Sequence, residues 1–167
     1  MIENKWFCEP DDQRECWCFL ILHMDYNEED FNITGWEIGY SNPRKIVRKI
    51  KNSKSNEKQI IKELLHELYY CRKNRIILIT FGVDVFPAIR TRIILMDLKD
   101  ASLRRIKYIS VEKLIAEYFL FYIFNSTATA LPMIIKRMNI ANEKSSDVEM
   151  LWKIFLRIGP VLPDGVI

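Results

Sequence analysis

An amphipathic helix followed closely by an apolar strand constrains the fold of this chain most. Within residues 57–71, apolar side chains recur at helical spacing along one stripe: Ile60, Ile61, Leu64, Leu65 and Leu68. Ser55 or Asn56 is placed to cap the start of this helix, and the basic cluster 72–75 suits the negative end of its dipole. The apolar run 76–81 follows at once and indicates a buried strand. A helix joined by a short polar loop to such a strand predicts an α/β fold.

The residues before this helix predict an antiparallel meander. The run 16–24 is apolar on both faces, as expected for a strand inside a covered sheet. Apolar side chains alternate along residues 31–40, which predicts a strand antiparallel to the first one, with a bulge at Gly35. Residues 45–50 suit a short third strand. We therefore expect a mixed central sheet, an antiparallel meander plus parallel strands, flanked by helices.

Further helices and one short strand are predicted after residue 81. The helices cover 87–96, 111–124 with Ser110 as cap, 132–138 starting at Pro132, and 147–158, and the strand covers 106–109. Aromatic residues surround helix 111–124 on all sides. A helix that is apolar all round is either central or docked on a partner, so we expect this one to contact a protein partner or a second copy of the chain.

Length and charge point to a single domain over residues 1–167, in which the acidic residues 1–14 form a flexible extension. Met1 precedes a polar, acidic stretch rather than a signal peptide. The longest apolar run contains Glu117 and is too short to cross a bilayer. We therefore expect a cytoplasmic protein with no membrane partner.

The four cysteines do not have the spacing of a zinc site. Two states stay open for them. They are buried free thiols, or Cys8 pairs with Cys16 or Cys18 in a disulfide, as occurs inside hyperthermophilic cells.

Basic residues are concentrated after the acidic N-terminal region. A positive surface of this kind can hold the phosphates of DNA or RNA, although lysine-rich solvated surfaces are also common. The predicted nucleic-acid-binding residues are Arg44, Lys45, Arg48, Lys49, Arg72, Lys73 and Arg75.

In order, these elements resemble the DEDD 3′–5′ exonuclease domain of the ribonuclease H-like fold, as found in the proofreading domain of family B DNA polymerases. The strand ending in Asp25 precedes Asn27, and the strand 76–81 runs into Gly82, Asp84 and an arginine-containing helix. The resemblance covers nearly the whole chain and is carried by layout more than by identities. It implies two divalent metals, Mg²⁺ or Mn²⁺, held by four carboxylates that converge from separate elements.

The carboxylates that this resemblance assigns are only partly present. Asp25 matches the first acid, Asn27 replaces the second, and Asp84 matches the third. Asp147 heads the last helix and matches the fourth in one alignment, while in another alignment that motif is missing. As plain alternatives, Asp25 is a turn residue, and Asp84 and Asp147 are helix caps. His23, beside Asp25, is a minor candidate for a catalytic base.

The incomplete acid set favours a non-catalytic, exonuclease-like accessory or scaffold protein of a DNA replication, repair or other nucleic-acid-processing complex, with no cofactor. One alternative is an active exonuclease that uses Mg²⁺ or Mn²⁺ on Asp25, Asp84 and Asp147. Another is a purely structural subunit of a hetero-oligomer.

Overall fold

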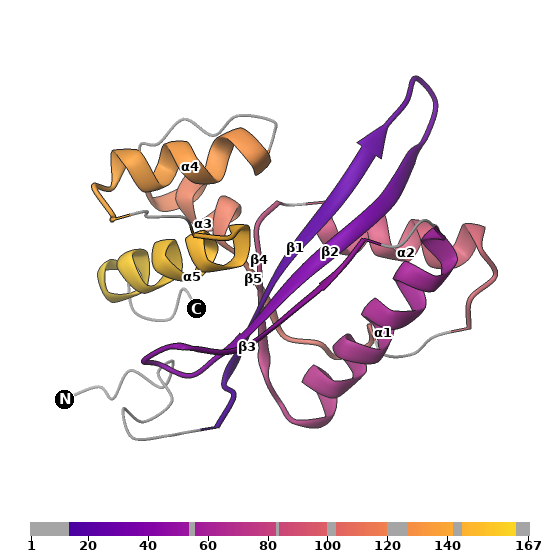
Figure 1. Ribbon diagram of the computed structural model, residues 1–167, viewed down its shortest axis with the longest axis horizontal. Coiled ribbons are helices and arrows are strands. Elements are labelled where there is room, and N and C mark those ends of the chain that lie inside the picture. Colours follow the sequence, from indigo (N-terminus) through magenta and orange to yellow (C-terminus); the bar gives the residue numbers. More distant parts are fainter. Residues whose placement is uncertain are drawn as a thin grey trace.

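A five-stranded mixed sheet forms the centre of the protein (Figure 1). The computed structural model describes residues 14–53, 56–82, 84–99, 103–119, 127–141 and 145–162. In the sheet the strands lie in the order β3-β2-β1-β4-β5. Their bounds are β1 Trp17–Tyr26, β2 Phe31–Ser41, β3 Ile46–Asn52, β4 Ile77–Thr80 and β5 Tyr108–Ser110.

The direction of the strands confirms the expected mixed α/β sheet. Strands β1, β2 and β3 are antiparallel neighbours, and β4 and β5 run parallel to β1 on its other side. The register of β1 with β2 shifts between His23 and Met24, opposite Gly35. The bulge predicted at Gly35 is therefore present. The twisted β1–β2 hairpin projects beyond the helices (Figure 1).

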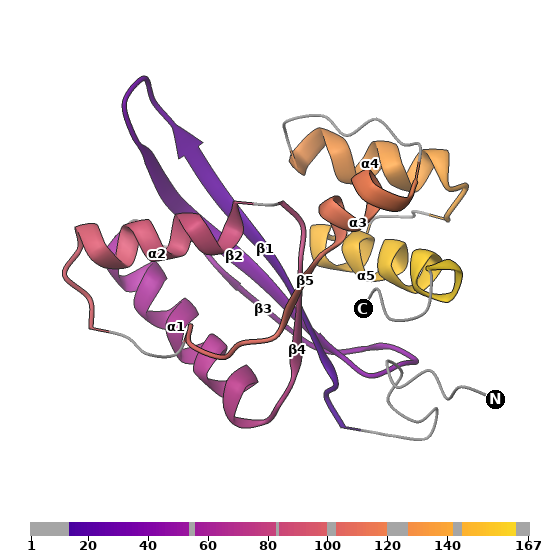
Figure 2. The ribbon, with the colours of Figure 1, turned by 180° about the vertical axis from the view of Figure 1, so that it is seen from behind.

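Helices cover both faces of the sheet. As Figures 1 and 2 show from opposite sides, α1 and α2 lie on one face, and α3, α4 and α5 lie on the other. Their bounds are α1 Glu57–Lys73, α2 Val85–Leu95, α3 Val111–Tyr118, α4 Thr127–Arg137 and α5 Asp147–Ile158, followed by the 3₁₀ turn η1 Gly159–Val161. Within the described residues, no helix has the length and apolar character needed to cross a membrane.

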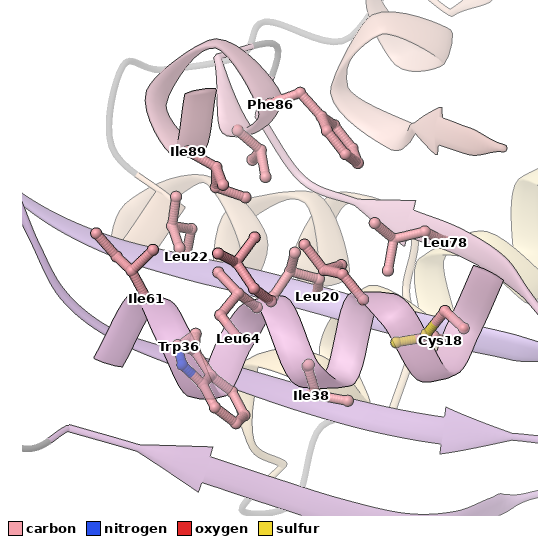
Figure 3. Close-up of a cluster of buried hydrophobic side chains, with 14 of the residues drawn as sticks. Cys18, Leu20, Leu22, Trp36, Ile38, Ile61, Leu64, Leu78, Phe86 and Ile89 are labelled. Atoms are coloured by element: carbon pink, nitrogen blue, oxygen red, sulfur yellow. The ribbon is translucent and has the colours of Figure 1, made fainter. Parts of the chain in front are cut away.

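The first core lies between the sheet and helices α1 and α2 (Figure 3). Successive side chains of a strand point to opposite faces, so one alternate set from β1 enters this core: Cys18, Leu20 and Leu22. The predicted stripe of α1 packs against them, and Asn56 caps that helix by accepting a hydrogen bond from the Gln59 N–H. The predicted helix 57–71 and its asparagine cap are thereby confirmed.

The second core lies on the opposite face and takes the other alternate set from β1, Trp17, Phe19 and Ile21. Helices α3, α4 and α5 supply the rest of this core. Phe155 of α5 contacts both aromatic rings of β1 edge-on, with ring centroids 5.5 Å from Trp17 and 5.7 Å from Phe19. Strand β1 is thus buried on both faces, as its continuous apolar run predicts.

Two predicted helix boundaries differ from the structure by five residues or more. Helix α4 begins at Thr127 rather than at Pro132, which lies inside it. The burial of Leu131, Ile134 and Ile135 in the second core outweighs the one backbone hydrogen bond that a proline removes. The helix predicted over 111–124 ends at Tyr118, because the backbone of Phe119 turns to an extended conformation and its ring packs on the second core.

The shorter α3 does not have the all-round apolar surface that suggested a partner. Val111, Leu114 and Ile115 are buried, while Lys113, Ala116 and Glu117 are exposed, so its described residues form an ordinary amphipathic helix. The remaining aromatic residues of the predicted helix lie outside the described residues.

The cysteines occupy both of the states left open by the sequence. Cys18 and Cys71 are free and buried in the first core. Cys16 is disulfide-bonded, so Cys18 is not the partner of Cys8, which itself lies outside the described residues.

A buried arginine connects the hairpin, α1 and α2. Arg92 of α2 is 7% exposed and forms ion pairs with Glu57 at 2.6 Å and Asp30 at 3.1 Å. Glu57 also accepts a hydrogen bond of 2.7 Å from the backbone N–H of Ile33. The bond to Glu57 is the first cause of the raised pKa of Arg92. This network fixes α2 and the start of α1 against the turn end of the β1–β2 hairpin.

We expect Arg92→Met to lower the free energy of unfolding by about 3 kcal/mol, because it leaves the Glu57 carboxylate partly buried without its cation. Urea denaturation measures this loss. The matched control is Arg90→Met on the exposed side of α2, which should stay within about 0.5 kcal/mol of the wild type. Adding Glu57→Gln to Arg92→Met should recover part of the loss, and no recovery would contradict an electrostatic origin.

Candidate metal centre and basic cavity

Three side chains with metal-binding atoms meet on the α5 side of the sheet. They are His23 of β1, Glu37 of β2 and Asp147 at the start of α5, and one ligand atom from each lies within 4.8 Å of the other two. Among the described residues, no other group of three or more histidine, cysteine, aspartate or glutamate side chains has its ligand atoms this close together.

The strand register explains why His23 and Glu37 meet. His23 follows Ile21 by two residues, so it belongs to the set of β1 side chains that faces α5. Glu37 is the direct neighbour of Ile21 across the β1–β2 pair, and neighbouring residues of paired strands point to the same face. Both side chains therefore project toward the helix that carries Asp147.

The first turn of α5 lies very close to the sheet. A Cβ atom at Gly39 of β2 would come within 3.3 Å of the Val148 side chain, so a residue without a Cβ allows this approach. Next to Val148, Glu149 forms an ion pair of 2.7 Å with Lys49 of β3 and accepts a hydrogen bond of 2.8 Å from the backbone N–H of Ser146. The pKa of Glu149 is lowered mainly by the hydrogen bond from Lys49, and next by the bond from the Ser146 N–H. Val148 and Glu149 thus hold the start of α5 on the sheet.

Glu37 is buried and His23 and Asp147 are half-buried, and the three side chains have no partners within the described residues. Glu37 is 7% exposed, and the Nε2 atom of His23 is buried without a hydrogen bond. None of the three side chains forms a hydrogen bond or an ion pair with the rest of the described chain. A buried carboxylate without a partner, beside a second carboxylate, is unfavourable unless a cation joins them.

The structure places the sequence-predicted acids in different surroundings. Asp147 belongs to the cluster. Asp25 is exposed near the end of β1, opposite Asn32, and Asp84 is exposed at the N-cap position of α2 without a capping hydrogen bond from its side chain. Neither is part of the cluster with Asp147. Asn27, at the position of the second acid, accepts hydrogen bonds from two backbone N–H groups of the hairpin turn.

The predicted basic residues do not form one surface. Arg48 lies on the α1 side, with its guanidinium 4.0 Å from the centre of the Tyr40 ring and an ion pair of 3.2 Å to Glu15. Its neighbour Lys49 points to the other face, toward Glu149. Arg44 and Lys45 lie in the β2–β3 turn.

The other three predicted residues lie where α1 leads into β4, and two of them line a cavity of about 460 Å³. Its cationic side chains are Arg72 and Arg75 from the end of α1, with Arg105 and Lys107 from the segment before β5. Lys73 is exposed nearby on the last turn of α1. Apolar side chains, among them Ile76 and Ile106, complete the lining, and no acidic side chain is part of it.

Two of the arginines in this cavity have a left-handed backbone, Arg75 with φ 58° and Arg105 with φ 64°. Arg75 follows the end of α1 in a turn where the Ile76 N–H bonds the Cys71 carbonyl and the Arg75 N–H bonds the Arg72 carbonyl. Glycine is the usual residue at this position, and a side chain there is disfavoured by roughly 1–2 kcal/mol. The turn explains the conformation of Arg75 but not the choice of an arginine.

Sequence reasoning missed Glu37, Arg105 and Lys107. Glu37 is a single acid between Trp36 and Ile38 in a strand. An acidic residue that interrupts a buried strand was the one sequence feature that could have marked it as a candidate site residue. Arg105 and Lys107 are distant in sequence from the basic cluster 72–75, and only the parallel pairing of β4 with β5 brings the two segments together.

No protein-family model matches this sequence, and neither does any curated protein.

We expect Glu37→Gln to stabilise the metal-free protein by about 1 kcal/mol, since the amide removes a buried negative charge next to Asp147. Thermal unfolding in the presence of a chelator measures the change. Glu57→Gln is the matched control: its carboxylate has partners, so the same substitution should destabilise. A loss of stability in both variants would show that Glu37 has a structural partner.

Proposed function

We propose that this protein is a ribonuclease H-like, exonuclease-like module that binds nucleic acid without cutting it. It would act as an accessory or scaffold subunit of a DNA replication, repair or other nucleic-acid-processing complex. The observation that carries the proposal is the cavity lined by Arg72, Arg75, Arg105 and Lys107.

The order of the elements supports the family assignment within this proposal. The meander β1–β3 comes first, helix α1 follows, and β4 then runs toward Gly82 and an arginine-containing α2. This is the layout on which the resemblance to DEDD exonucleases rests, and mixed strand directions agree with it.

The chemistry of the cavity suits a nucleotide of a single strand. The four cations of its lining offer contacts for phosphates, and its apolar side chains offer a surface for a base. A volume of about 460 Å³ is within the range of small-molecule sites. The planar arginine side chains also match the two oxygens of a phosphate.

The β2–β3 turn adds positive charge at the same end of the sheet. Ser41 at the end of β2 and Ile77 at the start of β4 both pair with Trp17, so the turn with Arg44 and Lys45 and the α1–β4 turn share this end. The acidic hairpin turn with Glu28, Glu29 and Asp30 lies at the other end. A bound strand would therefore be attracted to one end and repelled from the other.

The proposal excludes cutting because the two-metal site of the family does not fit the residues present. Asp25 and Asp84 are not in the cluster with Asp147, and Asn27 is occupied in the hairpin turn. A pair of hydrolytic metal ions about 4 Å apart needs converging carboxylates around both ions.

Two glycine substitutions separate binding from folding. Arg75→Gly with Arg105→Gly removes two charges at left-handed positions, so stability should be unchanged or rise by about 1 kcal/mol. Affinity for single-stranded DNA should fall, and the slope of log K against log salt should decrease by about 0.7 for each lost contact. Fluorescence anisotropy against salt measures both quantities.

The control is Asp97→Gly with Asn139→Gly, at the two other left-handed non-glycine positions of the described chain. This pair should not reduce binding. Equal loss in both pairs, or a wild-type affinity that does not change with salt, would contradict the proposal and favour a purely structural subunit.

A second candidate, an active metal-dependent nuclease, is favoured by the His23, Glu37 and Asp147 cluster. We expect no digestion of single-stranded or duplex DNA or RNA by the purified chain with Mg²⁺ or Mn²⁺. Digestion that Asp147→Asn abolishes, while Asp97→Asn does not, would replace the proposed function by this candidate.

A further inference from the structure

We propose that His23, Glu37 and Asp147 bind one divalent transition-metal ion, of the zinc, cobalt or manganese type, and not a pair of Mg²⁺ ions. The ion would join strands β1 and β2 to the first turn of α5. This site lies apart from the basic cavity and does not depend on nucleic-acid binding.

The type of donor atom decides the class of metal. Mg²⁺ prefers oxygen ligands only, whereas an imidazole nitrogen suits zinc and related ions. His23 supplies a nitrogen, and Glu37 and Asp147 supply carboxylate oxygens. One histidine with two carboxylates is a set of three protein ligands, which leaves a fourth position for water or another small ligand.

The geometry needs only a small closure. Ligands bound at about 2.0–2.1 Å to a tetrahedral ion lie roughly 3.3 Å from one another, and the three ligand atoms here are within 4.8 Å. The strands hold His23 and Glu37, and the contact of Val148 with Gly39 holds the helix that carries Asp147. Side-chain rotation alone can therefore complete the set.

Burial separates this cluster from an ordinary group of surface acids. Glu37 is more than nine-tenths buried and has no partner among the described residues, and the Nε2 atom of His23 is enclosed without a hydrogen bond. Two carboxylates and one imidazole lie close together here, and no hydrogen bond among the described residues joins them. A single dipositive ion would satisfy all three.

The experiment uses the full chain, first treated with a chelator and then titrated with Zn²⁺, Co²⁺, Mn²⁺ and Mg²⁺ separately by calorimetry, with the visible absorption of Co²⁺ as a second readout. We expect one equivalent of Zn²⁺ or Co²⁺ to bind and to raise the melting temperature, with much weaker binding of Mg²⁺. Two equivalents of Mg²⁺, or no binding of any of these ions, would overturn the proposal.

Variants assign the ligands. His23→Ala should weaken Co²⁺ binding by more than the roughly 10–100-fold loss that follows when a residue that only orients a metal ligand is changed. His66→Ala, on the exposed side of α1, should have no effect. Glu37→Gln, which should remain folded, must weaken binding as well. Asp147→Asn should do the same, whereas Asp25→Asn and Asp84→Asn should not. If Asp25→Asn and Asp84→Asn weaken binding and His23→Ala does not, the family's carboxylate set holds the metal and the proposal fails.

Discussion

The burial of strand β1 on both faces is the constraint on which the rest of the structure depends. Its residues Trp17 to Ile21 are 0–1% exposed, so each face needs its own layer of helices. Helices α1 and α2 cover one set of side chains, and α3, α4 and α5 cover the other. The same alternation continues past Ile21, the last apolar residue of β1 that faces α5. It therefore places the side chain of His23 in front of α5 as well.

Much of the fold could be predicted because its elements carry strong local patterns. Three elements could each be predicted from their own residues alone. They are α1 from its apolar stripe, β4 from its apolar run, and α5, Asp147–Ile158, from the serine cap before it and the Gly-Pro pair after it. The predictions that failed concern segments where tertiary contacts decide. Pro132 is tolerated inside α4 because its neighbours fill the second core, and Phe119 leaves α3 to pack on that core.

The candidate sites were harder to predict than the fold, for a geometrical reason. Asp147 was found because a helix start is a local signal, but its neighbours come from strands more than a hundred residues earlier in the chain. The alternation of Trp36, Ile38 and Tyr40 places Glu37 on the opposite face, but it does not tell which helix covers that face. A resemblance carried by layout directs attention to Asp25, whereas the β1 side chain in front of α5 belongs to His23, two residues before it.

The distance between the two candidate sites bears on how they would act together. The basic cavity lies at the start of β4, where Ile77 pairs with Trp17, and on the side of α1. The proposed metal position lies next to His23, six residues along β1, which is roughly 20 Å at about 3.3 Å for each residue, and on the opposite face. A phosphate held in the cavity is therefore too far from the metal position to be its substrate. The metal position and the basic cavity would therefore act independently, the first by joining α5 to the sheet.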